Sequence, residues 1–274
     1  MTLRMPAVAG LFYPDDPMEL RSLVGSLLAE AAGRTRPRTD VRPPVALITP
    51  HAGFMYSGPI AASAYALLRG HAGAIERVLL LGPSHRVALD GAALPRAHGF
   101  RTPLGDVPLD DDAARDILRL PYVSINNSAH AREHSLEVQL PFLQETLGEF
   151  RLLPLTLGRI DPASVREILT TLAPNERTLI VISSDLSHFH DYETARGMDG
   201  AASRAILDLN PDDLQREHAC GRHGIRGLLA YARAAGWTPH LADLRNSGDT
   251  AGDRSRVVGY GAYYFEPASA AQAP

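Results

Sequence analysis

Short apolar runs alternate with longer amphipathic stretches along most of this 274-residue chain. The short runs are rich in Val, Ile and Leu and predict buried strands of a parallel sheet; they occupy residues 45–49, 77–81, 151–155 and 177–182. The amphipathic stretches predict helices; they occupy residues 17–32, 59–69, 162–173, 192–207 and most of 211–235. This alternation predicts an α/β fold with a central, mostly parallel or mixed sheet sandwiched by helices.

The whole chain, residues 1–274, is expected to form a single domain. The Arg- and Pro-rich segment 33–44 reads as a loop within it, because the helix that precedes this segment is too small to fold alone. Residues 268–274 read as a frayed tail. The hydrophobic content of 45% and the charged content of 21% are ordinary for a globular protein.

Three of the apolar runs end in a turn and then a histidine. The three histidines are His51, His85 and His188. Ligand sites in open α/β sheets lie beyond the carboxyl ends of the strands, so we expect these imidazoles at one edge of one sheet. Such a cluster favours either a metal site or an acid/base site. Each histidine alone can also be a simple turn residue, and Ser84 can bond the turn before His85.

The densest polar cluster is SSDLSHFH, residues 183–190. Asp185 can orient His188, which can then act as a general acid or base, with Ser187 beside it. The alternative is an Asx-turn in which Asp185 bonds nearby backbone N–H groups.

Cys220 is the only cysteine of the chain. A single cysteine on a helix is usually a small buried apolar residue. As a thiolate, it is a soft ligand suited to iron, copper or zinc, and neighbours such as Arg222 can lower its pKa.

His134 and Glu137 stand three residues apart in a stretch that predicts a helix, residues 134–148, with a kink or break at Pro141. That spacing serves either a His/Glu metal pair or a helix cap. We expect both residues in the wall of the pocket or behind the ligands.

Composition and motif content exclude several classes of function. The net charge of −4 gives no basic footprint for nucleic acid, and no apolar stretch approaches the roughly 20 residues of a membrane span. The single cysteine rules out an intramolecular disulfide and favours a reducing, cytoplasmic location. Neither a Walker motif nor a GxGxxG motif after a strand is present, so no nucleotide cofactor is indicated.

Six sequence blocks resemble the Memo family, which in bacteria and archaea is component B of the AmmeMemoRadiSam system. In chain order the blocks are RMPAVAGLFYP, ITPHAGFMYSG, LLLGPSHRV, EHSLEVQLPFLQ, ISSDLSHFHDY and CGRHGI, from residue 4 to about residue 225. The family resembles class III extradiol ring-cleavage dioxygenases of the LigB type, which implies a single three-layer αβα domain.

The same resemblance implies metal ligands and roles. His51, His85 and Cys220 would hold iron, as Fe(II), or copper, while His188 would match the acid/base histidine of the dioxygenases and share its pocket with Asp185. Those dioxygenases hold iron with two histidines and one carboxylate. A thiolate in the third position is itself oxidisable, so ring cleavage does not simply carry over.

Three hypotheses follow for the function. The first is an iron- or copper-dependent redox enzyme of unknown substrate. The second is a non-catalytic protein whose pocket binds a metal, a small molecule or a peptide, acting as a partner of AMMECR1-type and radical SAM proteins. The third is a metal-independent hydrolase that uses His188 and Asp185, for which the chain offers no convincing nucleophile.

Overall fold

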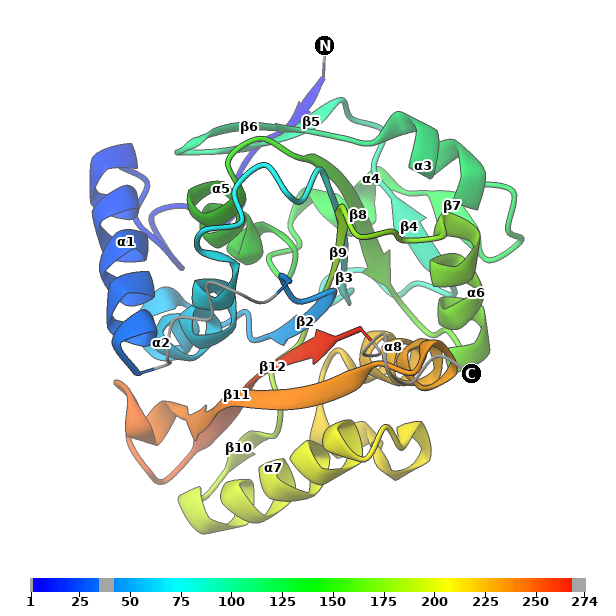
Figure 1. Ribbon diagram of the computed structural model, residues 1–274. Helices are drawn as coiled ribbons and strands as arrows, with labels where there is room; N and C mark the ends of the chain where they lie inside the picture. The colour runs from blue at the N-terminus through cyan, green and yellow to red at the C-terminus, as the bar shows by residue number, and fades with distance from the viewer. Residues whose placement is uncertain (1, 35–41, 268–274) are drawn as a thin grey trace.

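A mixed sheet of nine strands crosses the part of the protein that the computed structural model describes, residues 2–34 and 42–267 (Figure 1). Its centre consists of four mutually parallel strands, as the four apolar runs predict. In spatial order these are β2 (Ala46–Thr49), β9 (Thr178–Ser183), β3 (Arg77–Pro83) and β8 (Arg151–Leu157).

Antiparallel strands extend this centre on both sides. Beside β2 lies β12 (Val257–Glu266), which pairs with β11 (Thr238–Asn246) and β10 (His188–His190). Beside β8 lie β4 (Ala92–Leu94) and then β7 (Val123–Ile125). A small second sheet combines β1 (Leu3–Arg4), β5 (Gly99–Thr102) and β6 (Gly105–Pro108).

Helices cover the sheet on both faces, so the fold is a three-layer αβα domain (Figure 1). One face carries α1 (Pro17–Arg34), α2 (Phe54–Tyr65) and α5 (Leu140–Leu147). The other carries α3 (Asp111–Ile117), α6 (Pro162–Leu172), α7 (Tyr192–Leu207) and α8 (Arg222–Ala235). A short helix, α4 (Asn127–Ala131), follows β7.

The two cores explain why the central strands are apolar at every position. Along β2, Leu47 packs into the core under α1 and α2, whereas Ala46 and Ile48 pack into the core under α6 and α8. Successive side chains of a strand point to opposite faces, so a strand covered on both faces needs continuous apolar sequence.

Several predicted helix bounds differ from the structure. The helix predicted over 59–69 begins at Phe54 and has Pro59 inside it. Within 211–235, only α8 is a regular helix; short 3₁₀ turns, η3 (Pro211–Asp213) and η4 (Arg216–His218), precede it. Strand β11 was not predicted, because its half-exposed sequence TPHLADLRN carries only a weak apolar alternation.

Two of the predicted segments include residues that the structure does not describe. The loop predicted over 33–44 falls partly, and the tail predicted over 268–274 falls wholly, outside the described residues. None of the helices in the described ranges combines the length and the apolar character that crossing a membrane requires.

Candidate metal centre

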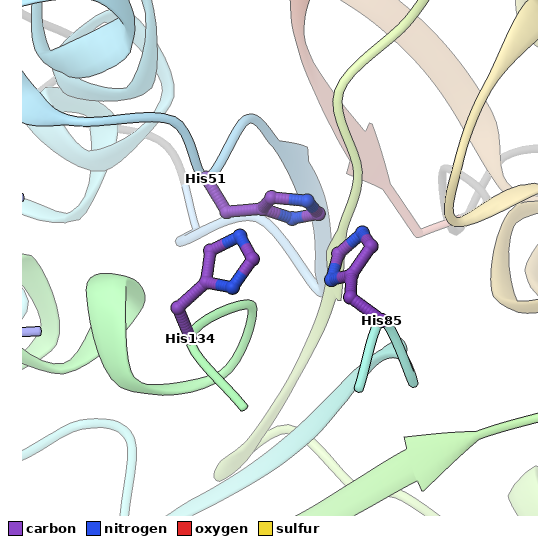
Figure 2. A group of neighbouring side chains, drawn as sticks. All are labelled: His51, His85 and His134. Atoms are coloured by element: carbon purple, nitrogen blue, oxygen red, sulfur yellow. The ribbon is translucent and has the colours of Figure 1, made fainter. Parts of the chain in front are cut away.

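Three histidines from separate segments meet at the carboxyl edge of the parallel strands (Figure 2). His51 follows β2, His85 follows β3, and His134 lies shortly before the 3₁₀ turn η2 (Glu137–Gln139). One ring nitrogen of each lies within 4.8 Å of the other two. The ring centroids are 4.8 to 5.5 Å apart. The sequence predicted the meeting of His51 and His85, and the structure adds His134 to them.

A hydrogen-bond chain fixes the tautomer of His51. Its Nδ1 lies 2.8 Å from Ser183 Oγ, and that hydroxyl donates its single proton to the Ser135 carbonyl over 2.6 Å. Ser183 Oγ must therefore accept from His51 Nδ1–H. The Nε2 atom of His51 is left with its lone pair, the form in which imidazole binds a metal.

Glu133 binds His85 through the corresponding ring atom, Nδ1. The carboxylate accepts from His85 Nδ1 at 2.9 Å and from the His85 backbone N–H at 2.6 Å. It also accepts from the backbone N–H groups of His134 and Ser135. Burial opposes ionisation of Glu133, but these hydrogen bonds and the charge interaction with His85 outweigh it and lower the pKa of Glu133 to about 2. Sequence reasoning missed this residue, although it stands directly before His134 in the EHSLE block.

His134 supplies the least satisfied polar atom of the cluster. Its Nδ1 is buried and lies 3.4 Å from Glu133 Oε1, without a well-formed hydrogen bond to any described residue. Its ring packs against Phe12 with centroids 4.9 Å apart. Burial lowers the pKa values of both His51 and His134, and the neighbouring imidazoles add to this. Imidazole nitrogens gathered within 4.8 Å of one another, two of them on rings whose pKa values are lowered, fit a bound transition-metal ion.

Cys220 lies beside this cluster. Its Sγ is 3.3 Å from His51 Nε2 and accepts from the Asp185 backbone N–H at 3.3 Å. It does not lie within 4.8 Å of all three histidines' ligand atoms and stays outside that group. Cys220 occupies the turn before α8 rather than the helix itself.

The pKa of the Cys220 thiol is shifted in the opposite direction to the one that the sequence suggested. Burial raises the pKa of Cys220, and the Asp185 carboxylate raises it further, so neighbours such as Arg222 do not lower it. Arg222 stands at the start of α8. The close approach of the Cys220 turn to β9 depends on Gly221, because a Cβ there would lie 2.6 Å from the Ser183 carbonyl oxygen.

Asp185 is held at the base of the site. Its Oδ1 accepts from the His51 backbone N–H at 2.7 Å, and its Oδ2 lies 3.9 Å from His51 Nε2. Burial raises its pKa, although the His51 N–H opposes the shift. Asp185, His134 and His188 line one cavity of about 1020 Å³. The structure therefore brings Asp185 and His188 to the same open space as His134, whereas His51 and His85 are not among the residues that line it.

Two further candidate site residues, Ser84 and Ser187, form hydrogen bonds within the fold. Ser84 Oγ donates to the Val87 carbonyl and closes the turn after β3. The backbone N–H of Ser187 donates to Asp199 Oδ1 at 3.0 Å, and the side chain of Ser187 is buried.

Glu137 serves the N-terminal segment instead of the histidine cluster. Its carboxylate pairs with Arg4 and accepts from the backbone N–H groups of Ala7 and Val8 and from the Tyr13 hydroxyl. The predicted shared helical face of His134 and Glu137 is wrong. The chain turns at His134, η2 begins at Glu137, and α5 begins only at Leu140, with Pro141 in its first turn.

The N-terminal segment tied down in this way forms one wall of the cavity. Residues 10–15 line it, together with the start of α2 and residues at the start of β12. The Phe12 carbonyl accepts from the Phe54 N–H at 2.7 Å, which joins this segment to α2. A site at the edge of the sheet is thus covered by the first residues of the chain.

The family model described as "Memo-like protein" matches residues 4–264. The chain belongs to the Memo family. A MEMO1 family protein of Aquifex aeolicus is 36% identical over 271 residues, covering 95% of this chain and 98% of the relative. A MEMO1 family protein of Sulfolobus acidocaldarius is 35% identical over 277 residues, covering 94% and 97%.

A solved structure shares the fold of this Memo family member. The crystal structure of uncharacterized protein JW3007 from Escherichia coli K12 has a TM-score of 0.52 and 14% sequence identity, and the match covers 78% of this chain and 98% of that one. At this identity the likeness bears on the fold alone, and it agrees with the three-layer architecture. The family resemblance noted in the sequence blocks is confirmed.

Proposed function

We propose that the protein is a metal-dependent redox enzyme whose ion is bound by His51, His85 and His134. The observation that carries the proposal is the convergence of three imidazoles beside an open cavity, two of them oriented through their Nδ1 atoms by Ser183 and Glu133. Imidazole ligands suit iron, copper and zinc alike. The resemblance to LigB-type dioxygenases favours Fe(II), with copper second.

Bound Fe(II) or copper would supply one-electron and dioxygen chemistry to a substrate in the cavity. The residues of the chain have separate tasks. Glu133 and Ser183 orient the ligand rings. His188, on the cavity wall, can take or give a proton to the substrate. Asp185, buried against the His51 backbone, keeps that loop in place.

Cys220 is a further candidate ligand, because its Sγ already touches His51 Nε2. Burial raises the pKa of the thiol, but binding to a metal ion would deprotonate it and release the proton to solvent. A His/His/Cys set and a three-histidine set share His51 and His85 and differ in the third ligand. Single substitutions of His134 and of Cys220 distinguish the two ligand sets.

A second function, a non-catalytic binding protein, is favoured by the rim of the cavity. Leu11 is 80% exposed and Met55 is 64% exposed, and both line the opening. Exposed apolar residues around a large cavity suit a peptide or a protein segment. Under this proposal the site holds a metal or a peptide for a partner such as an AMMECR1-type or radical SAM protein.

Oxygen uptake distinguishes the two functions. Protein loaded with Fe(II) or Cu is mixed with a panel of phenolic and carboxylated compounds, and oxygen consumption is followed with an electrode. The redox proposal expects turnover with at least one compound, loss of turnover in the double variant His51→Ala/His85→Ala, and loss with a chelator. Activity that survives chelation would reject metal dependence. Stoichiometric metal with no turnover across the panel would favour the binding protein.

A further inference from the structure

An arginine and an exposed aromatic ring meet at the mouth of the cavity. Arg256 lines the cavity, and its guanidinium carbon lies 5.3 Å from the centroid of the Phe189 ring. Among the described residues that line this cavity, Arg256 is the only lysine or arginine. No carboxylate of a described residue pairs with it. Its hydrogen-bond donors are therefore available to a ligand.

Phe189 is held in an unusual backbone conformation. Its φ is +62°, and its side chain is 62% exposed. A bulky residue with positive φ is strained, and strain of this kind persists where the surrounding structure enforces it. Here a register shift between β10 and β12 falls at this residue: His188 pairs with Val258 and His190 with Val257. Such a bulge redirects a side chain.

The bulge therefore has two consequences for the cavity. It places His188 on the cavity wall, and it brings the Phe189 ring under Arg256. Stacking on an aromatic face restricts the guanidinium and leaves its N–H edge free for a planar anion. Less conformational freedom is then lost when the anion binds.

Acidic residues on the cavity wall restrict the number of negative charges that a bound anion can carry. Carboxylates of four residues also line the cavity and disfavour a ligand that carries two negative charges. They belong to Asp15, Glu19, Asp185 and Asp253. One guanidinium matches one carboxylate in charge and in geometry. The remaining wall includes the aromatic residues Phe12, Tyr56 and Tyr260, which suit an apolar or aromatic body.

We propose that Arg256, positioned by Phe189, binds the carboxylate of a singly charged, apolar or aromatic carboxylic acid in the cavity. This names the substrate class of the site under the proposed function and rests on that function for its catalytic meaning. Arg256 and Phe189 are specificity determinants, because they hold the end of the substrate that does not react.

The test measures binding without turnover. Phenylacetate, its neutral analogue phenylacetamide, and phenyl phosphate are the probes, and dissociation constants come from ligand-observed NMR on the full chain. Variants are R256Q and F189L, with R254Q as the matched control. Arg254 is an exposed arginine that stacks on Tyr192, 4.4 Å from its ring centroid, and does not line the cavity. Metal content is measured separately for each protein, and binding is repeated after chelation.

The proposal expects phenylacetate to bind R256Q about tenfold more weakly than wild type, with F189L also weakened and R254Q unchanged. The difference persists after chelation, which separates this result from direct binding of the probe to a metal. Equal affinities of R256Q and R254Q, or of phenylacetate and phenylacetamide, would overturn the proposal. Tighter Arg256-dependent binding of phenyl phosphate would overturn the choice of a carboxylate.

The outcomes also separate this inference from the proposed function. Arg256-dependent binding in a protein that never takes up metal leaves the anion site standing and rejects the redox enzyme. A protein that takes up metal at the histidines but binds phenylacetate independently of Arg256 rejects the inference alone.

Discussion

Glu133 shows how one buried side chain can organise two of the proposed ligands. It bonds both the ring and the backbone of His85 and the backbone N–H of His134. A metal-binding histidine usually donates its second ring N–H to such a partner, which fixes the ring and raises its basicity. The affinity of the site therefore depends on a residue that does not touch the ion.

Glu133→Gln tests this dependence. The amide keeps the shape of the side chain but loses its charge, so we expect metal affinity to fall about tenfold to a hundredfold while the fold persists. A competition titration against a chromophoric chelator measures it. Glu30→Gln, an exposed helix residue that pairs with Arg34, is the control and should leave the affinity unchanged. Equal affinities of the two variants would show that Glu133 does not support the ligands.

The buried imidazole of His130 should make the stability of the fold depend on pH. Burial lowers its pKa to about 4, and its Nε2 lies 2.9 Å from the Ala93 carbonyl, to which it donates. In the unfolded chain the imidazole takes up its proton near its usual pKa of about 6.5. Because the folded pKa is the lower one, His130 stabilises the fold above that pH, and this contribution is lost as pH falls from about 6.5 to about 4.

Urea unfolding of metal-free wild type and His130→Gln checks this sign. The unfolding free energy of wild type, relative to that of His130→Gln, should fall by about 3 kcal/mol as the pH is lowered from 7 to 4. Other titrating groups are common to both proteins and cancel in the difference. A difference that stays constant over this range would mean that His130 titrates alike in both states.

At the scale of elements, the sequence predicts the sheet edge well and the loops poorly. The apolar runs locate β2, β3 and β9, and parallel pairing then brings His51 and His85 together. His134 was assigned to a helix face because its segment has helical spacing. It lies instead in a turn that only long-range contacts fix, namely those of Glu133 with His85 and of Ser135 with Ser183.

The N-terminal segment gives the clearest case of a contact that no local pattern reveals. Glu137 joins it across more than 120 residues of chain through Arg4, Ala7, Val8 and Tyr13. A buried carboxylate with this many partners reads in sequence only as one acidic residue of a helix. Its role depends on the tertiary fold, which the local spacing does not contain.

Glu137→Ala should therefore loosen the N-terminal segment. Breaking a buried ion pair by removing one partner leaves the Arg4 charge uncompensated, so we expect the unfolding free energy to fall by about 3 kcal/mol or more. Limited proteolysis should also cut before residue 16 sooner than in wild type. The control is Glu145→Ala, which breaks an exposed pair with Arg21 and should cost less than about 1 kcal/mol. Similar losses in the two variants would refute the anchoring role.

At the scale of the whole molecule, the metal should couple to stability. The ligands come from separate segments after β2, after β3 and before η2, so the site exists only in the folded state. An ion that binds only the folded state stabilises it by about 2.7 kcal/mol when its free concentration is a hundredfold above Kd. Calorimetry should show a higher Tm with Fe(II) under anaerobic conditions and no shift for His51→Ala/His85→Ala. A shift that persists in the double variant would place the ion elsewhere.

The central claim is that His51, His85 and His134 form one metal site, and metal analysis tests it most directly. Anaerobically purified wild type, His134→Ala, Cys220→Ala and the control His71→Ala are compared after reconstitution with Fe(II) and with Cu. His71 stands in the loop between α2 and β3, away from the site. We expect about one ion per chain in wild type and His71→Ala, and a sharp loss in His134→Ala. Full metal in His134→Ala with loss in Cys220→Ala would contradict the three-histidine set and assign the third position to the thiolate. No metal in wild type would contradict the site altogether.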